Sequence, residues 1–316
     1  MVGSFHRQSA AIWITPSEIG TEEVSAQIYW MRFSRTLLAV IAGSGLAISG
    51  LVFQALFRNP LATPYTLGIA SGAAFGASAA IQLTHLFRKT ALFGLFFLGI
   101  PVISWSAFAG AILAMVIVFS LARPKDASSD RMLLAGVAVN FFFSSLILLL
   151  QYIAQPHDVV QMLRWSMGGV NDASWRDIGQ LAPLVIVAGG ILFFLSRELN
   201  IIVTGQEHAM ALGINVYRLR TGLFLLFSLL VAAIVAVTGP IGFVGLMVPH
   251  IARLFVGPDH RWLVPTTLFC GGLFLAICDS LARTLMSPAE LPVGVLTSLL
   301  GGPFFLFLLL RNERRL

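Results

Sequence analysis

Charged residues are scarce in this chain of 316 residues. Asp, Glu, Lys and Arg together make up 11% of it, against roughly 25% in soluble domains. Hydrophobic residues make up 57%, and the mean hydropathy is +0.88. So few charges cannot form the surface of a soluble protein of this length. The composition therefore predicts a polytopic membrane protein.

Lysine is almost absent, since Lys89 and Lys125 are the only two lysines and neither follows a glycine. A phosphate-binding loop of the form GxxxxGK[ST] is therefore excluded, and any ATP that drives this protein must be bound by another chain. The net charge of +6 comes from basic residues scattered through short loops. That pattern indicates membrane topology and does not favour nucleic-acid binding.

Cysteine is nearly absent too. Cys270 and Cys278 lie eight residues apart in one apolar segment, a separation of about 12 Å along a helix, which is too far for a disulfide. No cluster has metal-ligand spacing, and no nucleophile lies beside a base. We therefore expect no metal site, no cofactor and no catalytic residue in this chain.

Long apolar runs predict about nine membrane spans, which form one all-α bundle and a single domain over residues 1–316. Residues 1–31 are too polar to span and lack the features of a signal peptide. The spans are expected near residues 36–57, 65–84, 95–122, 132–154, 178–196, 220–238, 242–257, 263–285 and 293–310.

Basic residues orient the spans. The tail after the last span carries Arg311, Arg314 and Arg315, and alternation places twelve basic residues on its side against seven on the other. This bias predicts a cytoplasmic C-terminus. Seven basic residues on the outer side are more than the rule favours and need another reason.

The segment 239–261, GPIGFVGLMVPHIARLFVGPDHR, is apolar but interrupted by glycines and prolines. Broken helices at membrane depth are typical of transport paths, so the segment indicates a channel or transporter subunit. His250 is expected to bond carbonyls freed by Pro249. Gln54 and Asn140, inside other spans, either face the pore or bond across helices. The candidate path or gate residues are Gln54, Asn140, Gly239, Pro240, Pro249 and His250.

Two segments between spans have their own character. Residues 155–175 form either a short interfacial helix over a pore mouth or a surface loop. Residues 203–220 predict a two-turn helix, with Thr204 as its N-cap, Glu207 in its first turn and Gly213 as its stop. Such a helix is either an ordered loop or a surface for a cytoplasmic partner.

Small residues recur four apart in two spans, at Gly43 and Ala47 and at Gly68, Gly72, Gly76 and Ala80. Such faces let helices approach closely. They indicate either packing within one subunit or a pore wall or subunit interface.

Three stretches carry a family resemblance: residues 32–73, 239–265 and 290–311. In this order they resemble the FecCD-type permeases, the membrane subunits of bacterial ABC importers for ferric siderophores, haem and vitamin B12. The resemblance implies an inner-membrane permease that pairs with a second permease subunit, a copy or a paralogue. Two ATPase subunits, which hold ATP and Mg, and a substrate-binding protein complete the importer.

The resemblance also implies roles for particular residues. The loop helix matches the coupling helix that docks on the ATPase, with Gly205, Glu207, Ala209, Leu212 and Gly213. Arg32 and Arg35, in the family's R-L-P-R motif, and Arg283 match arginines that dock the binding protein. Two plainer roles stay open. Arg283 and Asp279, four residues apart, either form an intrahelical ion pair or also dock, and Arg32 and Arg35 either dock or flank a span at headgroup level.

The chain departs from the family pattern at its start. Members normally have ten spans, and the first precedes the R-L-P-R motif; here that span is either lost or cut off by a truncated start. Phe33 and Ser34 stand where the motif has Leu and Pro. For the cargo we expect a ferric siderophore, with haem or cobalamin as alternatives. An ion-coupled secondary transporter is the rival from another class, and it has only Asp279 as an ionisable group within a span.

Overall fold

The computed structural model describes residues 23–86, 101–122, 129–286 and 289–313, and every regular element in these residues is a helix. The prediction of an all-α bundle is therefore confirmed. The helices are α2 (Glu23–Phe57), α3 (Ile69–Leu86), α4 (Val102–Ala122), α5 (Ser129–Ile153), α6 (Pro156–Ser166), α7 (Trp175–Phe194), α8 (Ser196–Thr204), α9 (Gln206–Ala211), α10 (Val216–Thr238), α11 (Val244–Val256), α12 (His260–Leu285) and α13 (Val293–Glu313).

Nine of the described helices match the nine predicted spans. Six are long and apolar enough to cross a membrane: α2, α4, α5, α7, α10 and α12. Three apolar helices are shorter, α3, α11 and α13, and α11 is the broken span predicted at 242–257. The first residues of the span predicted at 95–122 lie outside the described residues, as do residues 1–22 of the predicted N-terminal segment.

Helix α2 begins earlier than the sequence predicted, at Glu23 instead of near residue 36. No proline or glycine stands between Glu23 and Ala42, so nothing breaks the backbone hydrogen bonding of the helix. Phe33 and Ser34 replace the residues that would include a proline. Arg32 and Arg35 consequently lie inside a continuous helix of 35 residues.

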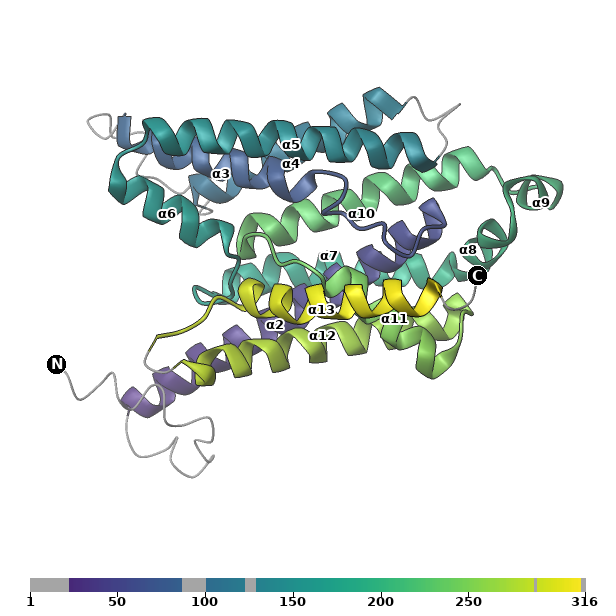
Figure 1. Ribbon diagram of the computed structural model, residues 1–316. Coiled ribbons are helices and arrows are strands. Elements are labelled where there is room, and N and C mark those ends of the chain that lie inside the picture. The colour runs from purple at the N-terminus through teal and green to yellow at the C-terminus, as the bar shows by residue number, and fades with distance from the viewer. Residues whose placement is uncertain (1–22, 87–100, 123–128, 287–288, 314–316) are drawn as a thin grey trace.

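The helices run roughly parallel, with α6 and the start of α2 at one end of the bundle and α9 and the end of α13 at the other (Figure 1). We call these the α6 end and the α9 end. Helix α10 lies between the group α3, α4 and α5 and the group α2, α11, α12 and α13. Within the segment 155–175, residues Pro156–Ser166 form the helix α6 at the α6 end, and its position over a pore mouth stays a prediction.

Glycines bring the central helices into close contact. A Cβ atom at Gly43 of α2 would lie 2.3 Å from the Gly271 carbonyl oxygen of α12, and one at Gly72 of α3 would lie 2.5 Å from the Gly110 oxygen of α4. These glycines therefore serve packing within one subunit, which was the first of the two sequence alternatives.

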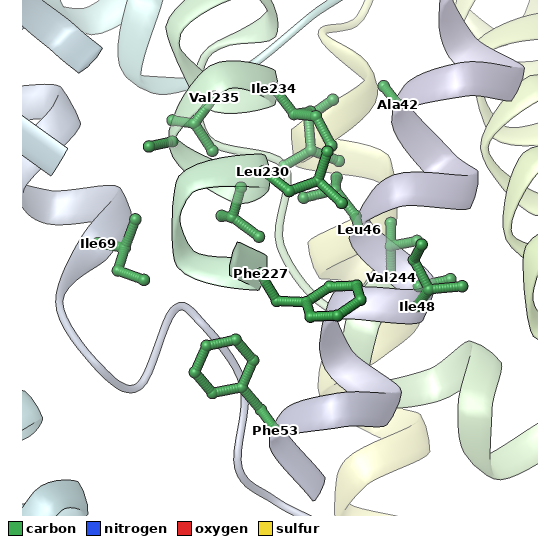
Figure 2. Close-up of a cluster of buried hydrophobic side chains, with 14 of the residues drawn as sticks. Ala42, Leu46, Ile48, Phe53, Ile69, Phe227, Leu230, Ile234, Val235 and Val244 are labelled. Atoms are coloured by element: carbon green, nitrogen blue, oxygen red, sulfur yellow. The ribbon is translucent and has the colours of Figure 1, made fainter. Parts of the chain in front are cut away.

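The core lies where α2, α10 and α11 meet. Phe53, Phe227 and Val244 are fully buried there, one from each helix (Figure 2). The opposite case is α5, whose most apolar window is only 17% buried. Its exposed side chains are large and apolar, such as Phe141 and Tyr152, as expected of a surface that does not face water.

Candidate functional site

The loop between α7 and α10 folds as two short helices, α8 and α9, that meet at Gly205. Gly205 has φ 159° and precedes the first residue of α9, whereas Thr204 is the last residue of α8. The Thr204 hydroxyl donates to the Ile201 carbonyl at 2.8 Å. The predicted Thr204 cap is therefore wrong, because the hydroxyl is used within its own helix. Gly213, with φ +81°, follows the end of α9 as predicted.

Helix α9 has one anchored face and one free face. Ala209 is fully buried against Ile202 and Val216, and its carbonyl accepts the Ile214 N–H at 3.0 Å. Glu207 is exposed, and Leu212 is 57% exposed just beyond the helix. The anchored face fixes α9 to the start of α10, and the side chains of Glu207 and Leu212 are left at the surface of the described residues.

At the α6 end, Arg35 is buried and carries two ion pairs. Its Nε and Nη2 donate to the Asp279 carboxylate of α12 at 3.1 and 2.9 Å. Its Nη1 donates to Glu290 Oε2 at 2.7 Å. Asp279 is 1% exposed. The sequence predicted a pair of Asp279 with Arg283 alone, and the structure adds Arg35 as a second partner. Arg283 also pairs with Asp279, at 3.3 Å.

Arg32 and Arg283 lie on the same cluster. Arg32 is partly buried and lies within electrostatic range of Arg283 and Glu290. Arg283 Nη2 donates to the Ser280 hydroxyl at 3.4 Å. The three arginines that the sequence singled out are therefore one group, and we call Arg32, Arg35, Asp279, Arg283 and Glu290 the arginine cluster.

Gly239 lies at a junction of three chain segments near the same end. A Cβ atom at Gly239 would lie 2.6 Å from the Trp165 oxygen of α6, one at Gly168 would lie 2.1 Å from the Pro240 oxygen, and one at Gly294 of α13 would lie 2.2 Å from the Met167 oxygen. Gly168 and Gly239 also have positive φ, +65° and +66°, which favours glycine.

Two backbone hydrogen bonds tie this junction together. The Gly169 N–H donates to the Thr238 carbonyl at 2.7 Å, and the Gly294 N–H donates to the Gly168 carbonyl at 3.2 Å. We call Gly168, Gly239 and Gly294 the glycine junction. It joins the end of α6, the end of α10 and the start of α13.

A side chain of α2 replaces the backbone hydrogen bond that is missing at Pro249 of α11. Pro249 lacks the N–H that would reach the Gly245 carbonyl, and Gln54 Nε2 donates to that oxygen at 3.2 Å. Gln54 Oε1 in turn accepts from Arg253 Nη1 at 2.6 Å. Gln54 is 4% exposed, so it bonds across helices, and it donates to the carbonyl that Pro249 leaves without its usual partner.

The other candidate path residues differ in their surroundings. The His250 ring packs edge to face on Phe304 of α13, with centroids 5.8 Å apart. Asn140 is exposed on α5. Pro249 is buried within α11, and Pro240 is half-buried beside the glycine junction. The structure thus brings Gln54 and Pro249 together at α11 and Gly239 and Pro240 together at the junction.

Helix α12 begins at an aspartate cap next to the inner loop. Asp259 Oδ1 accepts from the Arg261 N–H at 3.0 Å and from Asn200 of α8 at 2.7 Å. These bonds, the backbone one first, hold the pKa of Asp259 below its usual range.

Within the described residues no group of three or more His, Cys, Asp or Glu could hold a metal ion.

Sequence reasoning missed several of these residues. Glu290 carried a usable signal. Several arginines lie near one carboxylate, Asp279, at this end of the spans, and charges within a membrane protein need partners of opposite sign. Gly168 and Gly294 had weaker signals, as glycines in the segments 155–175 and 290–311. The Gln54 to Arg253 contact had none, since it depends on how α2 and α11 pack.

Comparisons with known proteins give one family. The model of the FecCD transport family matches residues 1–311. The hemin transport system permease protein HmuU of Yersinia pestis is 41% identical over 285 residues, 90% of this chain and 83% of that protein. The iron(3+)-hydroxamate import system permease protein FhuG of Bacillus subtilis is 35% identical over 292 residues, 92% of this chain and 86% of that protein.

A solved structure has the same fold. It is described as a metal-chelate type ABC transporter in an inward-facing conformation, and it is 34% identical to this chain with a TM-score of 0.78. The match covers 92% of this chain and 91% of that one.

Proposed function

The chain belongs to the FecCD transport family, and on that premise we propose that it is the permease subunit of an ATP-driven importer for a metal chelate. The observation that carries the proposal is the family match over residues 1–311. The chain itself would perform no chemistry. ATP and Mg would be bound by a separate ATPase, because this sequence has no phosphate-binding loop.

The proposed assembly adds three kinds of partner to this chain. A second permease subunit, identical or paralogous, would complete the pore. Two ATPase subunits would dock at the α9 end, and a substrate-binding protein would dock at the α6 end. The proposal places the chain in the inner membrane, with the α9 end and the C-terminus in the cytoplasm. The bias of basic residues supports this orientation.

The loop helix α9 is the proposed contact for the ATPase, through Gly205, Glu207, Ala209, Leu212 and Gly213. Its geometry suits that role, because Glu207 in the helix and Leu212 just past its end are exposed, whereas Ala209 between them is buried. Ala209 packs on Val216, the first residue of α10. A push on α9 would therefore reach α10 directly and shift the equilibrium between outward-open and inward-open states.

Helix α10 is suited to carry that push across the bundle. It is continuous for 23 residues, a length of about 35 Å, and no proline interrupts it. Its far end is the glycine junction, which holds α6 and α13 by backbone contacts. Movement of the loop helix would in this way change the packing at the α6 end.

The arginine cluster is the proposed contact for the binding protein, through Arg32, Arg35 and Arg283. It lies at the α6 end and contains three arginines and two carboxylates. Arginine side chains at this end favour a partner with acidic side chains. Such charges steer docking and fix its register more than they set its affinity.

For the cargo we propose a ferric siderophore, with haem and cobalamin as alternatives of the same class. The names of the relatives support the class, since HmuU is a hemin permease and FhuG an iron(3+)-hydroxamate permease. An ion-coupled mechanism is less consistent with the structure. Asp279, its one predicted carrier, is held by Arg35 and Arg283 and is 1% exposed.

Uptake into membrane vesicles tests the proposal. Vesicles that contain the permease, its ATPase and the binding protein should take up the chelate when ionophores collapse the proton and sodium gradients. The same vesicles should take up none without ATP. Uptake that follows an ion gradient and ignores ATP would contradict the proposal. The chelate that the purified binding protein retains would identify the cargo.

A further inference from the structure

The guanidinium of Arg35 has two edges with different neighbours. The edge formed by Nε and Nη2 faces Asp279, which is 1% exposed. The other edge, at Nη1, faces Glu290, whose side chain is 46% exposed. The Asp279 edge is enclosed by protein, whereas water reaches the Glu290 edge.

The two contacts consequently differ in how easily they exchange. Breaking the buried contact would leave Asp279 in the protein interior without its main partner, which is costly. The Glu290 carboxylate loses little when it leaves Arg35, because water solvates it and exposed ion pairs are weak. Of the two carboxylates, only Glu290 is therefore replaceable.

The charges of the cluster favour replacement by another carboxylate. Arg283 also contacts Asp279, at 3.3 Å, and Arg32 lies within electrostatic range of Glu290 and Arg283. Without Glu290, Arg35 and Arg283 would share the single carboxylate of Asp279. The position next to Nη1 is thus a site for a carboxylate, and the chain fills it with its own.

We infer that Glu290 is an internal substitute for a carboxylate of the docked binding protein and that docking displaces it from Arg35. The inference rests on the proposed function, because it requires a binding protein at the α6 end. The inference predicts the direction of the change in affinity. Because Glu290 competes with the partner, an acidic residue at this position weakens docking.

The position of Glu290 gives the exchange a second effect. Glu290 precedes α13 by three residues, and the next residue, Leu291, donates its N–H to the Ala282 carbonyl of α12 at 3.2 Å. The Arg35 contact holds the Glu290 side chain on α2. Docking would release that hold just ahead of the glycine junction at Gly294.

The test is the affinity of the binding protein for the complete permease and ATPase complex in lipid nanodiscs. Glu290→Gln removes the competing charge and keeps the size of the side chain. We expect it to tighten docking about two- to fivefold at low salt, the range of one exposed ion pair. The gain should shrink at 0.5 M salt, where the Debye length is only about 4 Å.

Three further variants make the result specific. Glu290→Ser, a second way to remove the charge, should tighten docking as well. Glu290→Asp keeps the charge and should bind more like the wild type than either neutral variant. Asp172→Asn removes a negative charge from an exposed residue between α6 and α7, and it should change affinity less than Glu290→Gln.

The outcomes separate this inference from the proposed function. If the wild type binds and both neutral Glu290 variants bind equally well or more weakly, Glu290 is no competitor and the inference is overturned. An equal gain from Asp172→Asn would overturn it too, because the effect would be general charge. If no variant binds at all, the docking proposal fails and the inference fails with it.

Discussion

Arg35 and Asp279 are 244 positions apart in the sequence, yet the Arg35 guanidinium donates to both oxygens of the Asp279 carboxylate. The pair joins α2 to α12 inside the bundle. Because Asp279 is 1% exposed, its charge is tolerated only while arginines neutralise it.

Arg35→Gln should lower the free energy of unfolding by about 3 kcal/mol or more, since it leaves a buried carboxylate short of its main partner. The measurement is the midpoint of thermal unfolding of the purified protein in detergent. Arg164→Gln, at an exposed arginine of α6, is the matched control and should change little. The double variant Arg35→Met with Asp279→Leu should lose less than Arg35→Gln; an equal or larger loss would contradict the buried-charge explanation.

The glycine junction should tolerate no side chain. Gly294→Ala places a Cβ 2.2 Å from the Met167 oxygen, so the backbones of α6 and α13 must separate at a cost of about 1–3 kcal/mol. Gly302→Ala is the control in the same helix, because nothing lies within 4 Å of its added Cβ. Unfolding midpoints of the two variants in the same detergent give the comparison. Equal midpoints would mean that the segments are not in contact.

Gln54 should matter for stability and Asn140 should not. Gln54→Leu leaves the Gly245 carbonyl and the Arg253 guanidinium without the amide that bonds both. An unsatisfied buried polar group costs about 1–3 kcal/mol. Asn140→Leu, at an exposed position of α5, should stay within about 0.5 kcal/mol. Thermal unfolding would show both, and a Gln54 variant as stable as the wild type would refute the bridging role.

The free face of α9 should be needed for ATP-driven uptake and not for folding. Leu212→Asp adds a charge to an exposed apolar contact, and we expect uptake to fall about tenfold or more, as for a central interface residue. Its unfolding midpoint should match the wild type, because Leu212 is 57% exposed. Co-purification of the ATPase with each variant separates loss of docking from loss of coupling.

Val203→Asp is the control for this last experiment, since Val203 is 44% exposed in the neighbouring helix α8, on the other side of Gly205 from Glu207 and Leu212. Normal uptake and normal ATPase co-purification in the Leu212 variant would remove α9 from the coupling role. A loss of uptake that is equal in the Val203 and Leu212 variants would indicate a general effect of charge in this loop.

What the sequence could predict follows from the range of the interactions involved. The nine apolar helices were predicted because each span is a local run of apolar residues. The stop of α9 at Gly213 was predicted because a glycine at the end of a helix is also a local signal. The contacts of Arg35 with Asp279 and of Gln54 with Gly245 join residues far apart in the chain, so their residue types were noticed but their partners were not. The early start of α2 was missed because charged and polar residues hide a helix that continues past the apolar run.

The length of α2 sets the depth of the arginine cluster. From Arg35 to Phe57 the helix rises about 33 Å at 1.5 Å per residue, close to the roughly 30 Å thickness of the hydrocarbon layer. With Phe57 at one boundary of that layer, an upright α2 brings Arg35 to the opposite boundary. Arg32 then stands one turn higher, among the lipid headgroups. Bilayers of different thickness would therefore raise or lower this cluster relative to the headgroups, which gives a test of the proposed docking that needs no mutation.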